Sequence, residues 1–153
     1  MLKSIIVPLV VLGLLSGTHA NAQNFSFDAK RNEITPLGGI GPEGALYTGA
    51  SYSGTYTAKF DGEKPTKGTY KCVVTSQPPG LFQSHTACTM KQSDGSFTSA
   101  WGCNALNAEG TEMTCVGGLF GRSGRFEGLR GGAANHVKGA DSEGVGHFYA
   151  IGQ

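Results

Sequence analysis

The chain has 153 residues, with 12 Lys and Arg, 11 Asp and Glu and a formal net charge of +1 at pH 7. This balanced charge, without a basic run, argues against a protein that attracts nucleic acid or a membrane surface electrostatically. Glycine is unusually frequent, with 25 residues, but the glycines follow no G-x-y period, which excludes collagen. Many glycines between short alternating segments are typical of turns, bulges and barrel corners.

The N-terminus has the three parts of a secretory signal peptide. Lys3 supplies a positive charge, residues 5–15 form an apolar run, and residues 20–22 form an A-x-A cleavage site. A helix that spans a membrane needs roughly 20 apolar residues, which excludes an anchor of this length. The sequence therefore predicts export, to the periplasm or the medium, with cleavage after Ala22. The mature chain of 153 − 22 = 131 residues is expected to have no membrane span.

Residues 23–45 are predicted to be an irregular N-terminal segment with one short strand around residues 24–28, because prolines and glycines crowd its second half. From residue 46 to residue 153, short strands alternate with turn signals such as Asp61-Gly62 and Asp94-Gly95, which predicts one β-barrel domain. No segment shows a helical period. The expected fold class is all-β, an antiparallel meander that closes into a small β-barrel with glycine-rich turns. Strands are expected near residues 46–60, 67–75, 84–92, 96–105, 111–119, 125–137 and 144–151.

The four cysteines fall on the more apolar face of alternating segments. Cys72 shares its face with Tyr70 and Val74, and Cys115 shares its face with Met113. In an exported domain an even number of cysteines predicts disulfides, here two with three possible pairings. No C-x-x-C pair occurs and no histidine stands at ligand spacing from a cysteine, so we expect no metal site and no cofactor.

Hairpin register helps to choose between the pairings. A turn centred near Gly80 places Cys72 directly opposite Cys88. A two-residue turn at residues 94–95 places Cys88 opposite Trp101 and leaves it diagonal to Cys103. Directly opposed Cβ atoms are about 4.5–5.5 Å apart, close to what a disulfide needs.

The same count opposes Cys103 to Cys115 across a turn centred on Glu109. We therefore predict two disulfides, Cys72–Cys88 and Cys103–Cys115, each on the core face of a hairpin.

Residues 116–132 carry the densest local signal, a run of glycines and arginines. The run has no G-K-[ST], and no helical pattern follows it, which argues against a phosphate loop. Arg125 stands where a G-x-S-x-G elbow would have its last glycine. The remaining interpretation is a strand-turn-strand junction in which glycines supply positive φ and Phe126 fills the core.

Within this run, residues 121–131 (GRSGRFEGLRG) resemble the G-G-T-G-R-F-x-G-x-R-G signature of the allene oxide cyclase and dirigent barrel superfamily. Arg122 replaces a glycine and Ser123 a threonine. The resemblance implies a barrel in which this segment ends one strand and starts the next. Its members include cyclases that act on hydrophobic epoxides, and proteins that steer radical coupling in a barrel cavity. Their working residues lie outside the signature, so no catalytic residue is assigned. The matching positions are Gly121, Gly124, Phe126, Gly128 and Gly131.

Aromatic residues are expected mostly to fill the barrel interior. If some line an open cavity, their hydroxyls and the indole would be polar contacts for an apolar ligand. Arg125, within a cluster of arginines, could hold an anionic group. The speculative ligand-binding residues are Tyr52, Tyr56, Tyr70, Trp101 and Arg125.

Other charged and titratable groups are expected to be paired on the surface. We expect His136 and His147 to be nearly opposed across a hairpin with a turn near residues 141–142. We expect the three arginines at 122, 125 and 130 to pair with Glu127, Glu112 and Asp141.

Three functions follow from these features. The first is an exported, non-catalytic barrel that binds a small hydrophobic ligand or has a structural role in the envelope. The second is a cyclase or isomerase, which would need a cavity of several hundred Å³ with a buried carboxyl group of shifted pKa. The third is a secreted inhibitor or interaction protein that uses residues 29–45 as an arm. The sequence does not indicate an oligomeric state.

Overall fold

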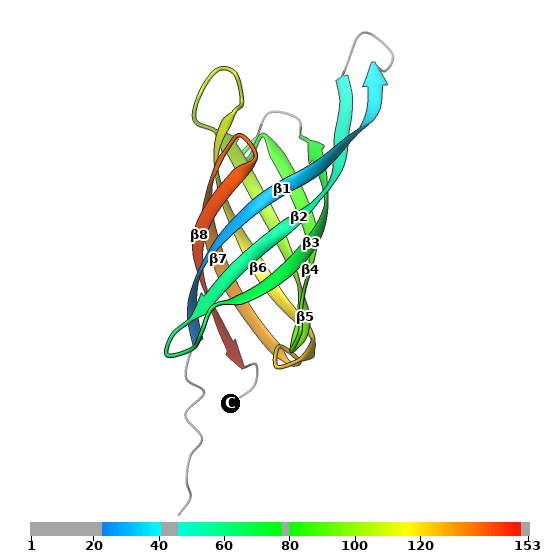
Figure 1. The fold of residues 1–153 in the computed structure, drawn as a ribbon. Coiled ribbons are helices and arrows are strands. Elements are labelled where there is room, and N and C mark those ends of the chain that lie inside the picture. Colours follow the sequence, from blue (N-terminus) through cyan, green and yellow to red (C-terminus); the bar gives the residue numbers. More distant parts are fainter. Residues whose placement is uncertain (1–22, 41–45, 78–79, 151–153) are drawn as a thin grey trace, which may run out of the picture.

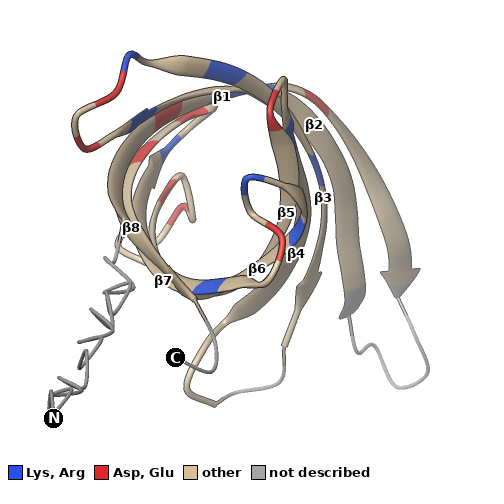
Figure 2. Cartoon of the chain, turned by 90° about the horizontal axis from the view of Figure 1, so that it is seen from below, with Lys and Arg blue, Asp and Glu red and all other residues tan. Residues whose placement is uncertain are grey.

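The computed structural model describes residues 23–40, 46–77 and 80–150, which form a closed β-barrel. Eight antiparallel strands follow one another in chain order, and β1 pairs with β8 to close the ring. Figure 1 shows the tilted strands, and Figure 2 shows the ring from below. The strands are β1 (Gln23–Ile40), β2 (Leu46–Phe60), β3 (Thr66–Ser76), β4 (Ser84–Gln92), β5 (Gly95–Ala105), β6 (Glu112–Gly124), β7 (Leu129–Lys138) and β8 (Asp141–Ala150).

The predicted all-β meander barrel is confirmed. The glycine-arginine run contains a strand-turn-strand junction as predicted, but the turn is at residues 125–128 rather than 120–124, since β6 ends at Gly124 and β7 begins at Leu129. Within the described ranges, the structure contains no helix of the length and apolarity that crossing a membrane would require.

The short strand expected around residues 24–28 is present, but it is part of a strand that covers residues 23–40. The prediction of an irregular segment is therefore wrong for the rest of its described part, and the barrel begins at residue 23 rather than 46. Residues 23–40 form β1, which pairs with β8 up to Lys30 and with β2 along its length. Pro36 lies beyond Lys30, where β1 pairs with β2 alone. An edge tolerates proline because the missing N–H has no partner to lose there. Residues 31–40 thus form an edge beside β2, and only the end of this edge, residues 38–40 paired with residues 46–48, extends past β3 as a two-stranded arm (Figure 1).

Both predicted disulfides are present. Cys72 faces Cys88 with 4.0 Å between their Cα atoms, and Cys103 faces Cys115 with 4.1 Å between theirs. All four side chains point into the barrel and are buried. Disulfides persist in oxidising compartments, so the pair indicates an exported protein.

The register between β4 and β5 differs from the prediction by two residues. The turn is Ser93-Asp94, so Cys88 faces Ser99, and Trp101 faces Thr86. An even shift leaves each side chain on its expected face, because strand side chains alternate with a period of two. The predicted inward and outward faces are therefore correct although the predicted partners are not.

Phenylalanines fill the end of the barrel that carries the turns at 61–65, 93–94 and 125–128. Phe126 is fully buried in the last of these turns, and its ring centroid lies 4.9 Å from Phe97 and 5.1 Å from Phe148. Gly121 makes this packing possible, because a Cβ there would lie 1.5 Å from the carbonyl oxygen of Phe126. The set at this end is Phe25, Phe60, Phe97, Phe126 and Phe148. We call it the closed end.

Arg125 covers the closed end from outside. Its guanidinium donates two hydrogen bonds of 2.6 Å to the Glu63 carboxylate and one of 3.3 Å to Asp94. It also donates to the side-chain oxygen of Gln23 and stacks over the Phe60 ring at 4.5 Å. One side chain thus joins the start of β1 to three neighbouring turns.

Candidate ligand cavity

The opposite half of the barrel interior is hollow. A cavity of about 410 Å³ lies there, walled by inward-facing side chains from all eight strands. Its size follows from the sequence, because the inward positions that hold phenylalanine at the closed end are occupied here by smaller residues. These are Ala29, Ala50, Ser84, Thr86 and Ser142.

Aromatic rings and sulfur line most of this cavity. Phe27 and Trp101 lie toward the closed end with ring centroids 6.5 Å apart. Tyr52 and Tyr70 meet edge to face at 6.1 Å. Met90, Met113 and both disulfides complete the apolar wall. Such a surface suits a ligand with an apolar body, since polarisable sulfur and aromatic faces adapt to varied shapes.

The two tyrosines are neutral hydroxyls at physiological pH. Burial raises the pKa of Tyr52, although the nearby Thr86 hydroxyl and the charge of Arg31 act in the opposite direction. Burial also raises the pKa of Tyr70 to about 12, with a further rise from Tyr52 and a lowering from Arg31. Both phenols therefore keep their protons and can donate hydrogen bonds into the cavity.

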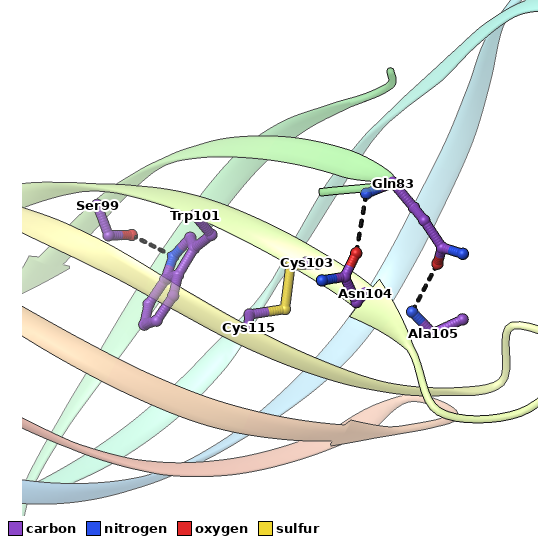
Figure 3. Close-up of a disulfide and its surroundings, with 7 residues drawn as sticks. All are labelled: Gln83, Ser99, Trp101, Cys103, Asn104, Ala105 and Cys115. Carbon is purple, nitrogen blue, oxygen red and sulfur yellow. Dashed lines mark hydrogen bonds between the residues drawn. A yellow bond between two sulfur atoms is a disulfide. The ribbon is translucent and has the colours of Figure 1, made fainter. Parts of the chain in front are cut away.

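The indole of Trp101 is already paired within the protein. Its Nε1–H donates to Ser99 Oγ at 2.8 Å, as Figure 3 shows. Because an indole has one donor and no acceptor, Trp101 contributes only its ring to a ligand.

Two buried polar atoms on the cavity wall have no hydrogen-bond partner among the described residues, Ser84 Oγ and Asn135 Oδ1. Ser84 faces Cys103 on the next strand, and Asn135 faces Cys115. The two atoms therefore flank the disulfide drawn in Figure 3, in a single row across four strands. Buried polar groups are nearly always hydrogen-bonded, so two unpaired atoms in one row of the described residues are unusual.

A β-bulge brings a charged side chain to the same cavity. Arg31 continues the inward alternation of β1, and an extra residue, Asn32, interrupts the pairing with β2 directly after it. Ile34 consequently faces inward as well, three residues later, opposite Tyr52. Bulges redirect side chains in this way beside binding sites. Arg31 is the one charged residue among the described residues that line the cavity.

The predicted ligand-binding residues divide between the two halves of the barrel. Tyr52, Tyr70 and Trp101 line the cavity. Tyr56 lies outside it, where its ring packs edge to face on Phe97 and its hydroxyl donates to Gln92 at 3.0 Å. Arg125 lies at the closed end. The structure therefore brings three of the five residues together.

Arg31, Ser84 and Asn135 were not among the residues predicted from the sequence to line a cavity. Ser84 and Asn135 fall on the inward face by strand alternation, which is the signal that could have identified them. Arg31 had no such signal, because its segment was expected to be irregular and the bulge that follows it leaves no mark in the sequence.

The expected pairing of histidines is also wrong. His136 faces Glu143, and His147 faces Gly132, because the turn between β7 and β8 lies at residues 139–140. His136 instead contacts the Glu112 carboxylate, with 2.8 Å from Nε2 to the oxygen.

The expected partners of the arginines are wrong too. Arg125 pairs with Glu63 and Asp94, and Arg130 lies over the Phe120 ring at 4.8 Å. Their neighbours come from other strands and turns, which the local sequence does not reveal.

Neither Asp nor Glu is among the described residues that line the cavity. Within the described ranges, no group of three or more His, Cys, Asp or Glu side chains could hold a metal ion.

Comparisons of the chain with protein-family models, with curated proteins and with solved structures find no match.

Proposed function

We propose that this protein is an exported, non-catalytic β-barrel that binds a small, mainly apolar molecule in the open half of its interior. The observation that carries the proposal is the cavity of about 410 Å³, whose mainly apolar wall includes the side chains of Tyr52 and Tyr70. Pockets for small molecules typically measure 300–1,000 Å³ and combine an apolar lining with a few placed polar groups.

Binding accounts for the lining better than a cyclase or isomerase does. The enzyme alternative needs a general acid or base beside the substrate, and the described lining offers no carboxyl group and no histidine. The tyrosines keep high pKa values, so they are poor bases at neutral pH. The resemblance of residues 121–131 to the allene oxide cyclase and dirigent superfamily supports a barrel with a cavity, without supplying a reaction.

An interaction protein with residues 29–45 as its arm is less well supported. Among residues 23–39 of β1, Ile34 and Leu37 are the exposed large apolar residues, at 52% and 49% of their full accessibility. Ile34 also lines the cavity, so its exposure is explained by a position at the cavity mouth.

Export is part of the same proposal, with residues 1–22 as a cleaved signal peptide. The two disulfides support it, because they need an oxidising compartment. Expression of the full chain in a bacterial host tests this point, since the exported protein should begin at Gln23. Recovery of intact residues 1–22 from the exported fraction would contradict it.

The binding proposal is tested with N-phenyl-1-naphthylamine, an uncharged probe that fluoresces in apolar surroundings. We expect saturable binding to the mature protein. Ala50→Phe, which places a ring in the cavity, should abolish it. The matched control is Ala87→Phe, because Ala87 is exposed on β4 and faces outward. Equal binding by both variants would overturn the proposal, and native mass spectrometry of the exported protein would identify a co-purified ligand.

A further inference from the structure

The described lining of the cavity carries a positive charge and no negative charge. Arg31 brings a positive charge to a lining that, within the described residues, contains no carboxylate. The structure records no ion pair of Arg31 within 4.0 Å in the described ranges, whereas Arg125 at the closed end has two carboxylates. A partly buried arginine without an anionic partner is unfavourable, because burial removes water from the charge.

The acidic residue nearest in sequence does not neutralise this charge. Glu33 follows the bulge and faces the outside of the barrel, opposite Ser53. Lys30, the preceding residue, also faces outward, opposite Asp141 on β8. The bulge therefore separates Arg31 from its charged neighbours and leaves it at the cavity.

Two phenol hydroxyl groups line the same part of the cavity. Arg31 pairs in register with Gly54, and the Tyr70 hydroxyl lies over Gly54, 2.4 Å from where a Cβ of that glycine would stand. A side chain at residue 54 would therefore displace the tyrosine. The charge of Arg31 acts on Tyr52 as well as on Tyr70, which places both phenols within its electrostatic range. A guanidinium flanked by neutral O–H donors is a typical binding site for a carboxylate, sulfonate or phosphate group.

We propose that the ligand is an organic anion, whose apolar body fills the cavity and whose acidic group pairs with Arg31 beside the Tyr70 hydroxyl. This inference rests on the proposed function, since it specifies the class of molecule that the cavity binds. The anionic group would neutralise the charge of Arg31, and the aromatic and sulfur-lined wall would contact the rest of the molecule.

Two fluorescent probes of similar shape separate this inference from binding as such. 1-Anilinonaphthalene-8-sulfonate carries a sulfonate, and N-phenyl-1-naphthylamine lacks it. For Arg31→Gln we expect the Kd of the sulfonate probe to rise about tenfold or more, because a charge-assisted pair is lost. The Kd of the neutral probe should change by less than about twofold. Higher salt should weaken binding of the sulfonate by the wild-type protein and have little effect on the variant.

Matched variants exclude indirect effects. Arg122→Gln removes the same charge from an exposed position on β6 and should leave both probes unaffected. Arg31→Lys should retain part of the preference for the sulfonate. Thermal unfolding of each variant shows that the barrel is intact.

The outcomes distinguish the two proposals. If the wild-type protein binds neither probe in the cavity, the proposed function fails. If it binds the neutral probe and Arg31→Gln does not change the Kd of the sulfonate, the anionic class is wrong while the cavity proposal stands. An equal loss of both probes would show that Arg31 acts through the shape of the cavity, which also overturns the inference.

Discussion

Replacing Phe126 by alanine tests whether the closed end provides much of the barrel's stability. The side chain is fully buried and contacts the rings of Phe60, Phe97 and Phe148 at centroid distances of 6.0, 4.9 and 5.1 Å. Truncating a buried phenylalanine costs about 3–5 kcal/mol, because contacts are lost and a void remains. Domains of this size have a free energy of unfolding of about 5–15 kcal/mol, so the loss is a large fraction of the total.

The matched control is Phe120→Ala. Phe120 is the same residue type on the adjoining strand, but it faces outward, is 37% exposed and contacts mainly Arg130. Its loss should cost under about 1 kcal/mol. Urea unfolding followed by circular dichroism measures both, and the dependence on urea should stay unchanged if the variants remain two-state.

A milder variant keeps the test informative if Phe126→Ala does not fold. Phe126→Leu retains most of the volume and should cost about 1.5 kcal/mol. Similar losses for the inward and outward positions, or a loss below about 1 kcal/mol for Phe126→Ala, would refute the reasoning that the closed end is the main packed core.

Two further predictions concern covalent and ionic links. Replacing Cys103 and Cys115 together by serine should lower the free energy of unfolding by about 3 kcal/mol, because the unfolded chain regains the conformational freedom of the loop that the disulfide closes. Urea unfolding measures this difference, and an unchanged free energy of unfolding would contradict the prediction. The second prediction concerns acid. Hydrogen bonds from Arg125 lower the pKa of Glu63 from its ordinary value of 4.5. Burial raises the pKa of Asp94, but hydrogen bonds from Gln92 and Arg125 outweigh this effect and leave the pKa below its ordinary value of 3.8. A carboxyl group whose pKa is lower in the folded state than in the unfolded state stabilises the fold. The stabilisation is complete at pH values above the unfolded-state pKa, and it is lost as the pH falls through the folded-state pKa. Arg125→Gln should therefore be less stable than wild type at pH 7, with the difference shrinking below about pH 4; a constant difference in thermal unfolding across this range would contradict the assignment.

The disulfides show what local pattern could predict. Alternation with a period of two determines which face each cysteine occupies, and the centre of a hairpin determines which residue it opposes. These two rules were sufficient to predict the disulfides Cys72–Cys88 and Cys103–Cys115. The register of β4 and β5 was missed by two residues because Ser93-Asp94, rather than Asp94-Gly95, forms the turn. Both dipeptides have the small and polar residues that turns prefer, so the sequence does not choose between them.

β1 shows where local pattern failed. Proline and glycine in residues 36–39 suggested an irregular segment, yet the barrel cannot close without the strand that joins β2 to β8. Pairing on both sides compensates for weak strand propensity over residues 23–30, and pairing with β2 alone tolerates Pro36 beyond them.

The sequence by itself determined the all-β class, the inward face of the four strands that carry cysteines and the disulfide pairing, because these depend on alternation and on turns between neighbouring strands. Only the tertiary structure decided that the barrel closes through β1, that Arg125 pairs with Glu63, and that Arg31 lies at a cavity. These features depend on the side chains that the eight strands bring to the same level along the barrel axis, through their summed volume and their charges. Phenylalanines from distant strands meet at one end, small residues meet at the other, and so a single barrel is packed at one end and hollow at the other.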